Sequence, residues 1–135
     1  MGLARWPVFR RWFGSRSERA AARFLRALGY RVLARNVVLP TGELDVIALD
    51  GLTLVFAEVR STEGEDVERP AASVDAEKQR RLTALALAYL QRHKLLGTPA
   101  RFDVLAVSWP PNRREPLVVH YPDAFPAVGR FQMFS

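Results

Sequence analysis

Apolar residues recur three or four positions apart in two segments of the chain, which is the spacing of one face of an α-helix. In the first segment they are Ala21, Phe24, Leu25 and Leu28, and in the second they are Leu82, Leu85, Ala86, Tyr89 and Leu90. Ser17 can cap the first segment and Gly29 can end it, so we expect a helix from about Ser17 to Leu28. The second segment predicts a longer helix from about Val74 to His93.

The remaining apolar segments are short and rich in β-branched and aromatic residues, which is typical of β-strands. They are residues 30–39, 43–50, 52–60, 101–108 and 117–121. Asp50-Gly51 is a hairpin signal between the second and third of them. The order helix, three strands, helix, two strands predicts an α/β fold with a mixed central β-sheet flanked by α-helices.

The chain has 135 residues, of which 49% are hydrophobic and 25% are charged, and it contains no repeats. This balance is typical of one globular domain. We expect residues 1–14 to form a basic, aromatic N-terminal arm and residues 15–135 to form a single domain. Residues 61–73 lack periodicity and hold four acids, which predicts a surface loop.

The positive charge is concentrated near the N-terminus. The net charge is +6, and residues 1–35 contain nine arginines and one acid, Glu18. A clustered basic surface suits a polyanion, either nucleic acid or an anionic membrane, although it can also serve solubility alone. The chain has eighteen arginines and only two lysines, Lys78 and Lys94, which is compatible with a codon-composition bias.

Several classes of chemistry are excluded by composition. The chain has no cysteine, and its two histidines, His93 and His120, are far apart, so disulfides, thiolate nucleophiles and histidine-rich metal sites are not expected. No apolar run approaches the roughly 20 residues that span a bilayer, and the first residues lack the apolar core of a secretory signal. We therefore expect a cytoplasmic protein whose chemistry uses carboxylates, hydroxyls, lysine or arginine.

The hairpin signal places charged residues together. A two-residue loop at Asp50-Gly51 would pair Glu43 with Glu58, and it would put Glu43, Asp45, Glu58 and Arg60 on one face of the sheet. Opposed acids require a counter-charge, which a hard divalent ion such as Mg²⁺ would supply. A salt-bridge cluster with Arg60 explains the same charges without a metal, and a β-bulge would change the register.

Several sequence blocks occur together in a specific order. They are Ser17-Glu18-Arg19-Ala20-Ala21, Leu28-Gly29-Tyr30, Ala34-Arg35-Asn36, Gly42-Glu43-Leu44-Asp45-Val46-Ile47-Ala48, Val55-Phe56-Ala57-Glu58-Val59-Arg60, Lys78 and Arg101-Phe102-Asp103-Val104. In these blocks the chain resembles the YraN-like family of bacterial proteins, over roughly residues 15–108. The resemblance implies a restriction-endonuclease-like fold, similar to archaeal Holliday-junction resolvases, and a nuclease core that uses Mg²⁺ or Mn²⁺.

The resemblance also implies roles for individual residues. Asp45 and Glu58 would be the metal-binding carboxylates, and Glu18 would complete or orient the site. Glu43 would be an auxiliary metal ligand or a group behind the ligands. Two carboxylates can hold Mg²⁺ against a scissile phosphate, where the ion stabilises oxyanion charge and acidifies a bound water. Lys78 would contact phosphate, although a solvated helix face explains it equally well.

Arg60 departs from the family pattern, which has lysine two residues after the glutamate. Arginine stays charged, so it can clamp a phosphate but cannot activate water as a lysine can. The sequence therefore leaves two main hypotheses, an endonuclease acting on structured or branched DNA and a catalytically impaired nucleic-acid-binding module. A protein-interaction adaptor is a third. The analogy with resolvases, which cut two strands symmetrically, implies a homodimer.

The N-terminal arm alternates aromatic and basic residues. The aromatic residues are Trp6, Phe9, Trp12 and Phe13, and Arg5, Arg10 and Arg11 lie among them. This pattern fits base stacking with phosphate contacts, in which Arg10, Arg11 and the helical Arg19 would bind nucleic acid. It also fits an interfacial amphipathic anchor, or simple packing against the domain or a second subunit. Trp109, Phe125, Phe131 and Phe134 are most simply core or dimer-contact residues.

Overall fold

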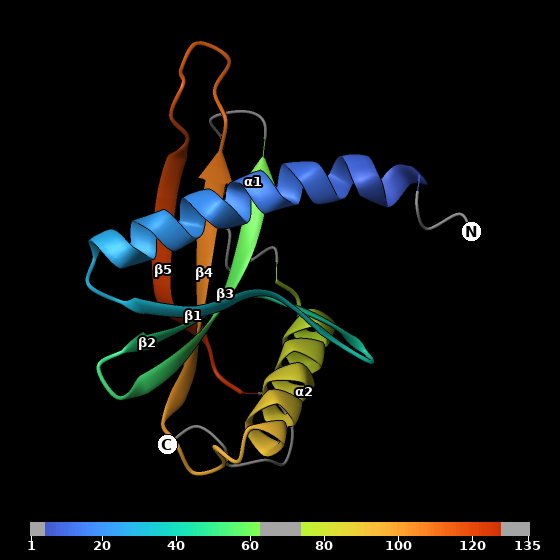
Figure 1. The fold of residues 1–135 in the computed structure, drawn as a ribbon, viewed down its shortest axis with the longest axis vertical. Helices are drawn as coiled ribbons and strands as arrows, with labels where there is room; N and C mark the ends of the chain where they lie inside the picture. The colour runs from blue at the N-terminus through green and yellow to red at the C-terminus, as the bar shows by residue number, and fades with distance from the viewer. Residues whose placement is uncertain (1–4, 63–73, 128–135) are drawn as a thin grey trace.

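The computed structural model describes residues 5–62 and 74–127, and at residues 5–15 and 62 it describes the backbone alone. Two helices and five strands follow one another along the chain (Figure 1). They are α1 (Arg5–Ala27), β1 (Arg31–Leu39), β2 (Gly42–Asp50), β3 (Thr53–Thr62), α2 (Ala76–Arg92), β4 (Ala100–Ser108) and β5 (Leu117–Phe125). The order is the one that the hydrophobic pattern predicts.

The five strands form one mixed sheet in the order β1-β2-β3-β4-β5. β3 and β4 run parallel, because α2 crosses over between them, and the other neighbouring pairs run antiparallel. The expected α/β class and the mixed sheet flanked by helices are thus confirmed. Among the described residues, no helix is long and apolar enough to cross a bilayer.

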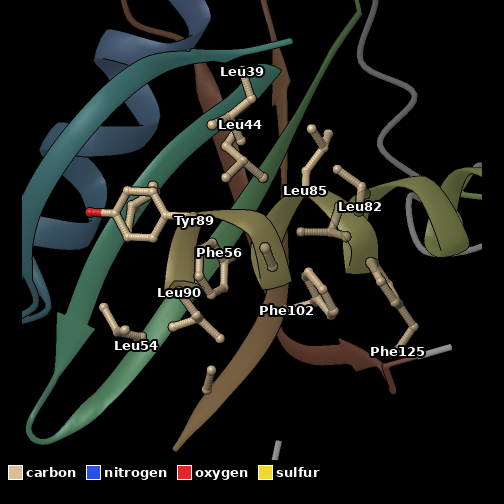
Figure 2. Close-up of a cluster of buried hydrophobic side chains, with 14 of the residues drawn as sticks. Leu39, Leu44, Leu54, Phe56, Leu82, Leu85, Tyr89, Leu90, Phe102 and Phe125 are labelled. Atoms are coloured by element: carbon tan, nitrogen blue, oxygen red, sulfur yellow. The ribbon is translucent and has the colours of Figure 1, made fainter. Parts of the chain in front are cut away.

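Each helix covers its own face of the sheet, and each face has its own core. Alternate residues of β3 point to opposite sides, so Val55 packs in the cluster beneath α1 and Phe56 packs in the cluster beneath α2. Phe56 and Phe102 lie at the centre of the α2 cluster, with Leu82 and Tyr89 of the helix against them (Figure 2). Phe125 stacks on Phe102 with ring centroids 4.7 Å apart, which confirms its core role. Phe131 and Phe134 lie outside the described residues.

Helix α1 begins at Arg5, much earlier than the expected start at Ser17. Pro7 is tolerated because it falls in the first turn, where the backbone N–H groups have no intrahelical acceptor. Gly14 costs a helix interior about 1 kcal/mol but does not end it. Ser17 therefore lies inside the helix, and the segment expected to be a separate arm is helical from Arg5 onward. The side chains of Arg10 and Arg11 lie outside the described residues.

The hairpin between β2 and β3 is shifted from the predicted register. Leu49 pairs with Leu54 and Asp50 pairs with Thr53, so the two loop residues are Gly51 and Leu52. Gly51 has φ +63°, which matches the glycine that a type II′ hairpin takes at its first central position. The predicted loop at Asp50-Gly51, and with it the pairing of Glu43 with Glu58, is therefore wrong. The shift moves the partner along β3 by two residues, so the residues that stay paired, Val46–Asp50 and Thr53–Ala57, keep their predicted faces.

Candidate active site where two strands separate

Strands β2 and β3 separate at Asp45. Their pairing ends at Val46 and Ala57, whereas β2 stays paired with β1 as far as Gly42. Leu44 packs in the α2 cluster and Val46 packs in the α1 cluster, so the strand changes face across Asp45. On β1, Asn36 adopts a positive φ of 54° in the same part of the ladder. The paired ends of β1 and β2 consequently bend away from β3 towards α2 (Figure 1).

The carboxyl group of Asp45 fills the gap between the separated strands. Its Oδ2 accepts a hydrogen bond of 2.9 Å from the backbone N–H of Val59. The same carboxyl hydrogen-bonds with Glu58 and with Glu18. Burial, and then the negative charge of Glu58, raise the pKa of Asp45 well above its usual value. Asp45 is therefore protonated more readily than an exposed aspartate, and its carboxyl lies against two acidic neighbours.

Glu18 reaches the same gap from α1. It is only 8% exposed, and Asn36 donates a hydrogen bond to its carboxylate. Burial raises its pKa, and the nearby charge of Glu43 acts in the same direction. Its Oε1 is buried and has no hydrogen-bond partner. An unpaired buried carboxylate oxygen is costly, and a cation would satisfy it. We call Glu18, Asp45 and Glu58 the acidic cluster.

A chain of hydrogen bonds fixes α1 above the sheet. The Ser17 and Ser61 hydroxyl oxygens are 2.7 Å apart, and the indole Nε1 of Trp109 donates to Ser17 Oγ at 2.9 Å. The guanidinium of Arg16 lies 3.6 Å from the centre of the Trp109 ring. Trp109 is thus partly buried and bridges α1 and β4, in keeping with the packing role expected for it. These hydrogen bonds hold in place the turn of α1 that carries Glu18.

Glu58 is paired with two cations from different elements. Its Oε2 lies 2.9 Å from Lys78 Nζ and 3.5 Å from Arg60 Nη1, and the Glu58 side chain is only 8% exposed. Lys78 lies in the first turn of α2, which Asp75 caps by accepting a 2.9 Å hydrogen bond from the Lys78 N–H. The site therefore contains three acids and two bases, contributed by four elements.

The structure brings together most of the residues expected to act together. Glu18, Asp45, Glu58, Arg60 and Lys78 meet at the separated strands. Glu43 does not face Glu58, because the register is shifted and the strand bends. Its side chain is exposed, and its negative charge raises the pKa of Glu18 instead. Within the described residues, no group of three histidine or acidic side chains is already arranged as a metal cage.

A divalent ion is nevertheless compatible with the donors present. Mg²⁺ is usually held by one or two carboxylates, and its other positions are taken by water and phosphate oxygens. Asp45 and Glu58 are in contact, and the unpaired Oε1 of Glu18 belongs to the same cluster. These residues fit a two-carboxylate site with a third acid beside it.

Two contributors to the site were not identified as such from sequence. Asn36 was only part of a family block, whereas in the structure its side chain hydrogen-bonds with Glu18 and its backbone has a positive φ. Asparagine is one of the few residues that tolerate this conformation, which is the one signal that could have singled it out. Ser17 was considered a helix cap, whereas its hydroxyl joins Trp109 to Ser61.

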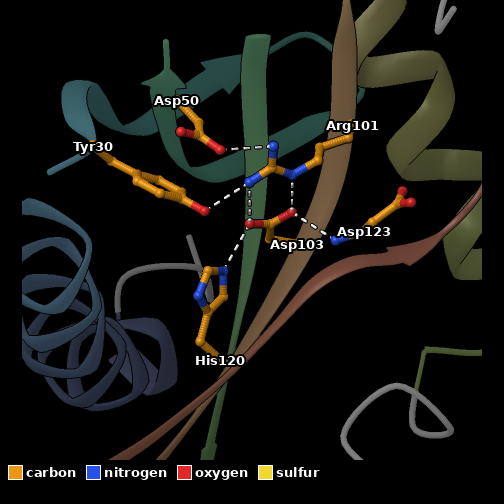
Figure 3. A network of polar contacts seen from close by, with 6 residues as sticks. All are labelled: Tyr30, Asp50, Arg101, Asp103, His120 and Asp123. Carbon is orange, nitrogen blue, oxygen red and sulfur yellow. Dashed lines mark hydrogen bonds and ion pairs between the residues drawn. The ribbon is translucent and has the colours of Figure 1, made fainter. Parts of the chain in front are cut away.

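A second polar network lies at the other end of α1 (Figure 3). The Asp103 carboxylate is completely buried and accepts hydrogen bonds from Arg101 Nε at 2.9 Å and from the backbone N–H of Asp123 at 2.9 Å. His120 Nε2 lies 2.7 Å from its other oxygen. Burial opposes ionisation, but the hydrogen bonds from His120 and Arg101 outweigh it and lower the pKa of Asp103. Both oxygens of the Asp103 carboxylate thus have hydrogen-bond partners within the protein, which favours a structural role for this network.

The solvent face of α1 carries a row of arginines. Arg19, Arg23 and Arg26 are exposed and recur at the spacing of one helix face, opposite the buried Ala21 and Leu25. In the described part of the chain, none of the three lies within ion-pair distance of an acid. We call these three residues the arginine stripe. It places Arg19 on a free basic surface beside the turn that carries Glu18.

A comparison with family models gives one match, to the uncharacterised protein family UPF0102, over residues 17–107. The chain belongs to this family. A UPF0102 protein of Rhodopirellula baltica is 46% identical over 119 residues, which cover 86% of this chain and 71% of the relative. A UPF0102 protein of Symbiobacterium thermophilum is 48% identical over 101 residues, covering 75% and 86%.

A UPF0102 protein of Myxococcus xanthus is 43% identical over 121 residues, which cover 90% of this chain and 94% of the relative. The segment matched by the UPF0102 model contains the acidic cluster together with Arg60 and Lys78. The resemblance deduced from the sequence blocks is thus confirmed at the level of the family.

Proposed function

We propose that this UPF0102 protein is a metal-dependent endonuclease that binds structured or branched DNA and hydrolyses its phosphodiester backbone. One observation carries the proposal, the meeting of Asp45 and Glu58 with the unpaired buried oxygen of Glu18. Raised acid pKa values at a site with specific charge partners are typical of functional sites. The proposal includes the cytoplasmic localisation expected from the sequence, because the proposed DNA substrate lies in the cytoplasm.

The residues divide the chemistry between them. Asp45 and Glu58 would hold Mg²⁺ or Mn²⁺, and the bound ion would supply a positive charge and acidify a water molecule. Hydrolysis forms a bond between the water oxygen and phosphorus, breaks one phosphorus–oxygen ester bond, and leaves the proton on the departing oxygen. Arg60 and Lys78 would donate hydrogen bonds to the phosphate, whose negative charge both side chains complement.

The arginine stripe is the proposed contact with the nucleic acid backbone. A helix that lies in a membrane surface needs a free apolar face. Over residues 16–27, where the side chains of α1 are described, the apolar face is instead buried against the sheet, through residues such as Ala21 and Leu25. Three arginines dominate the exposed side of the described part of α1, with Ala27 the other exposed residue there, which favours a phosphate backbone over a lipid surface.

Replacing Arg19, Arg23 and Arg26 together by glutamine is expected to weaken DNA binding and its salt dependence. Each lost phosphate contact lowers the slope of log affinity against log salt by about 1, so the slope should fall by about 2 to 3. Fluorescence anisotropy at several salt concentrations measures this slope. The matched control replaces Arg80, Arg92 and Lys94, which are also exposed and lie on or just after α2. Equal slopes for the two triple variants would reject the stripe as the contact.

The activity itself is tested on a panel of labelled substrates, namely linear duplex, single strand, flap and four-way junction. We expect wild-type protein to cut a branched substrate with Mg²⁺ or Mn²⁺ and to stop when EDTA is added. Arg60→Lys should be at least as active, because it restores the family pattern. Salt-sensitive binding without cutting, by both proteins, would support the alternative of a DNA-binding module that has lost turnover.

That alternative has its own supporting observation, because arginine occupies position 60. A guanidinium can stabilise negative charge but cannot give up a proton to activate water. A protein-interaction adaptor, the third hypothesis, would show no salt-dependent affinity for any nucleic acid.

A further inference from the structure

The cation closest to Glu58 does not come from position 60. Lys78 Nζ lies 2.9 Å from Glu58 Oε2, whereas the nearest guanidinium nitrogen of Arg60 lies 3.5 Å from the same oxygen. Charge-assisted hydrogen bonds between nitrogen and carboxylate are about 2.7–2.9 Å long. The hydrogen-bonded partner of Glu58 is therefore the lysine of α2, and Arg60 is a looser ion pair beside it.

We propose that Lys78, and not Arg60, supplies the principal cation of the candidate site, where it pairs with Glu58 and contacts the substrate phosphate. The chemical role of Lys78 rests on the proposed nuclease function. Its contact with Glu58, however, can be tested independently of any activity. The inference makes Arg60 an accessory phosphate ligand rather than the residue whose change decides whether the site works.

The local structure of α2 holds Lys78 in this position. Asp75 caps the helix through the Lys78 N–H, and Val74, just before it, is buried and accepts a 2.8 Å hydrogen bond from Gln79. Leu82, one turn after Lys78, packs in the core of the sheet. A lysine in the first turn of a helix would otherwise be unfavourably placed for the helix dipole, and Glu58 offsets this cost. The capped and packed first turn of α2 thus directs the Lys78 side chain towards the sheet.

The side chain of Lys78 can serve both Glu58 and a substrate. It is 32% exposed, so one side of the ammonium faces the buried carboxylate and the rest remains accessible. A lysine ammonium carries three donors on a flexible stem, so it can donate to Glu58 and to a phosphate oxygen at once. In this role the ammonium of Lys78 stabilises charge on the phosphate and orients the attacking water.

Nuclear magnetic resonance can observe the contact directly, because the chain has only two lysines. Protein labelled with ¹³C in lysine gives one Cε signal for Lys78 and one for Lys94, and Lys94→Arg assigns them. Lys94 follows the other end of α2, roughly 25 Å away at 1.5 Å per residue, so it is an internal control. We expect Glu58→Gln to shift the Lys78 signal and to leave the Lys94 signal in place.

Mn²⁺ provides the second arm of the same experiment, with the metal alone as the probe. If the ion binds the acidic cluster, it should broaden the Lys78 signal at concentrations that leave the Lys94 signal sharp. Asp45→Asn should remove this selective broadening. A Lys78 signal that does not respond to Glu58→Gln, or that broadens no more than that of Lys94, would overturn the inference whether or not the protein cuts DNA.

Cleavage assays separate the role of Lys78 from that of Arg60. Lys78→Met should lower the maximal cleavage rate about 100-fold or more, which is the usual loss when one charge-stabilising donor is removed, with little change in DNA affinity. Arg60→Met should cost less than about 10-fold, and Lys78→Arg should recover part of the rate. Arg80→Met makes the same charge change on the exposed side of α2 and serves as the control.

The possible outcomes are distinguishable. A larger loss in Arg60→Met than in Lys78→Met would place the decisive cation at position 60 and contradict the inference. If wild-type protein cuts no substrate, the proposed function fails, while the lysine signals still show whether Lys78 is the partner of Glu58. Circular dichroism and thermal unfolding of each variant confirm that the compared proteins are folded.

Discussion

Asp45→Asn is expected to lower metal-dependent DNA cleavage on the order of 10³-fold and to make the protein more stable at pH 8. The substitution removes a carboxylate that would hold the metal ion, and loss of one such electrostatic group typically costs 10²- to 10³-fold. An asparagine oxygen can still accept the 2.9 Å hydrogen bond from the Val59 N–H. The fold should therefore be kept while the chemistry is lost.

The gain in stability follows from the raised pKa of Asp45. Because this pKa is higher in the folded chain than its ordinary value of 3.8, folding favours the protonated carboxyl. Its contribution to stability is present below about pH 3.8 and is lost as the pH rises through the folded pKa. Asparagine stays neutral throughout, so at pH 8 the variant should gain about 1 kcal/mol, as neutralised functional sites often do.

Thermal unfolding between pH 4 and pH 8 measures the gain, and the cleavage panel measures the loss. Asp123→Asn is the matched control, because Asp123 is exposed and its positive φ of 51° is tolerated by asparagine. If Asp45→Asn cut DNA at the wild-type rate, Asp45 would not be a metal ligand. If it failed to fold, the acid would be structural.

Asp103→Ala should destabilise the protein by about 3–5 kcal/mol, the usual cost of removing one partner from a buried ion pair. The substitution leaves Arg101 without its buried partner, His120 without an acceptor, and the Asp123 N–H without its hydrogen bond. These contacts tie β4 to β5 and, through the 2.7 Å hydrogen bond from Arg101 to Tyr30, to the segment after α1. The loss should appear as an earlier midpoint in urea unfolding.

The control for this variant is Asp50→Ala, which removes the other carboxylate that binds Arg101. The Asp50 side chain is 46% exposed, so its 3.0 Å ion pair contributes at most about 1 kcal/mol. Because the pKa of Asp103 is lowered from 3.8 on folding, its contribution is present above that pH and lost as the pH falls below it. Equal losses in the two variants would contradict a structural role for the buried network.

The common face of Asp45, Glu58 and Arg60 could be predicted from the sequence because it depends only on the two-residue period of a strand. The loop was misplaced, but the correction moves the partner by an even number of residues, so Asp45 still lies with Glu58 and Arg60, whereas Glu43, beyond the bend, does not. Asp45 was expected opposite Phe56 and instead lies against Glu58. A prediction of which face a strand residue occupies thus holds when the register is wrong by two residues, although it does not identify the residue on the neighbouring strand that it contacts.

The three-dimensional details of the site could not be predicted in the same way. The bend at Asp45 depends on the backbone of Asn36 and on packing of the strand ends against α2, which no local pattern encodes. The contact between Lys78 and Glu58 depends on how a helix crosses between two parallel strands. Fold class and candidate acids follow from short-range patterns, whereas the pairing of cations with acids is a property of tertiary structure.

The hydrogen bonds that hold α1 join residues very far apart in the chain. The Val59–Asp45 bond spans 14 residues, whereas the Ser17–Ser61 and Trp109–Ser17 bonds span 44 and 92. Contacts that close long loops form late during folding, because the entropy of closure is lost before they are gained. The docking of α1, which positions both Glu18 and the arginine stripe, thus depends on residues from distant parts of the chain. The acids of β2 and β3 are brought together within one hairpin, whereas Glu18 joins them only through the docked helix, so a variant that loosens α1 should change the acidic cluster without unfolding the sheet.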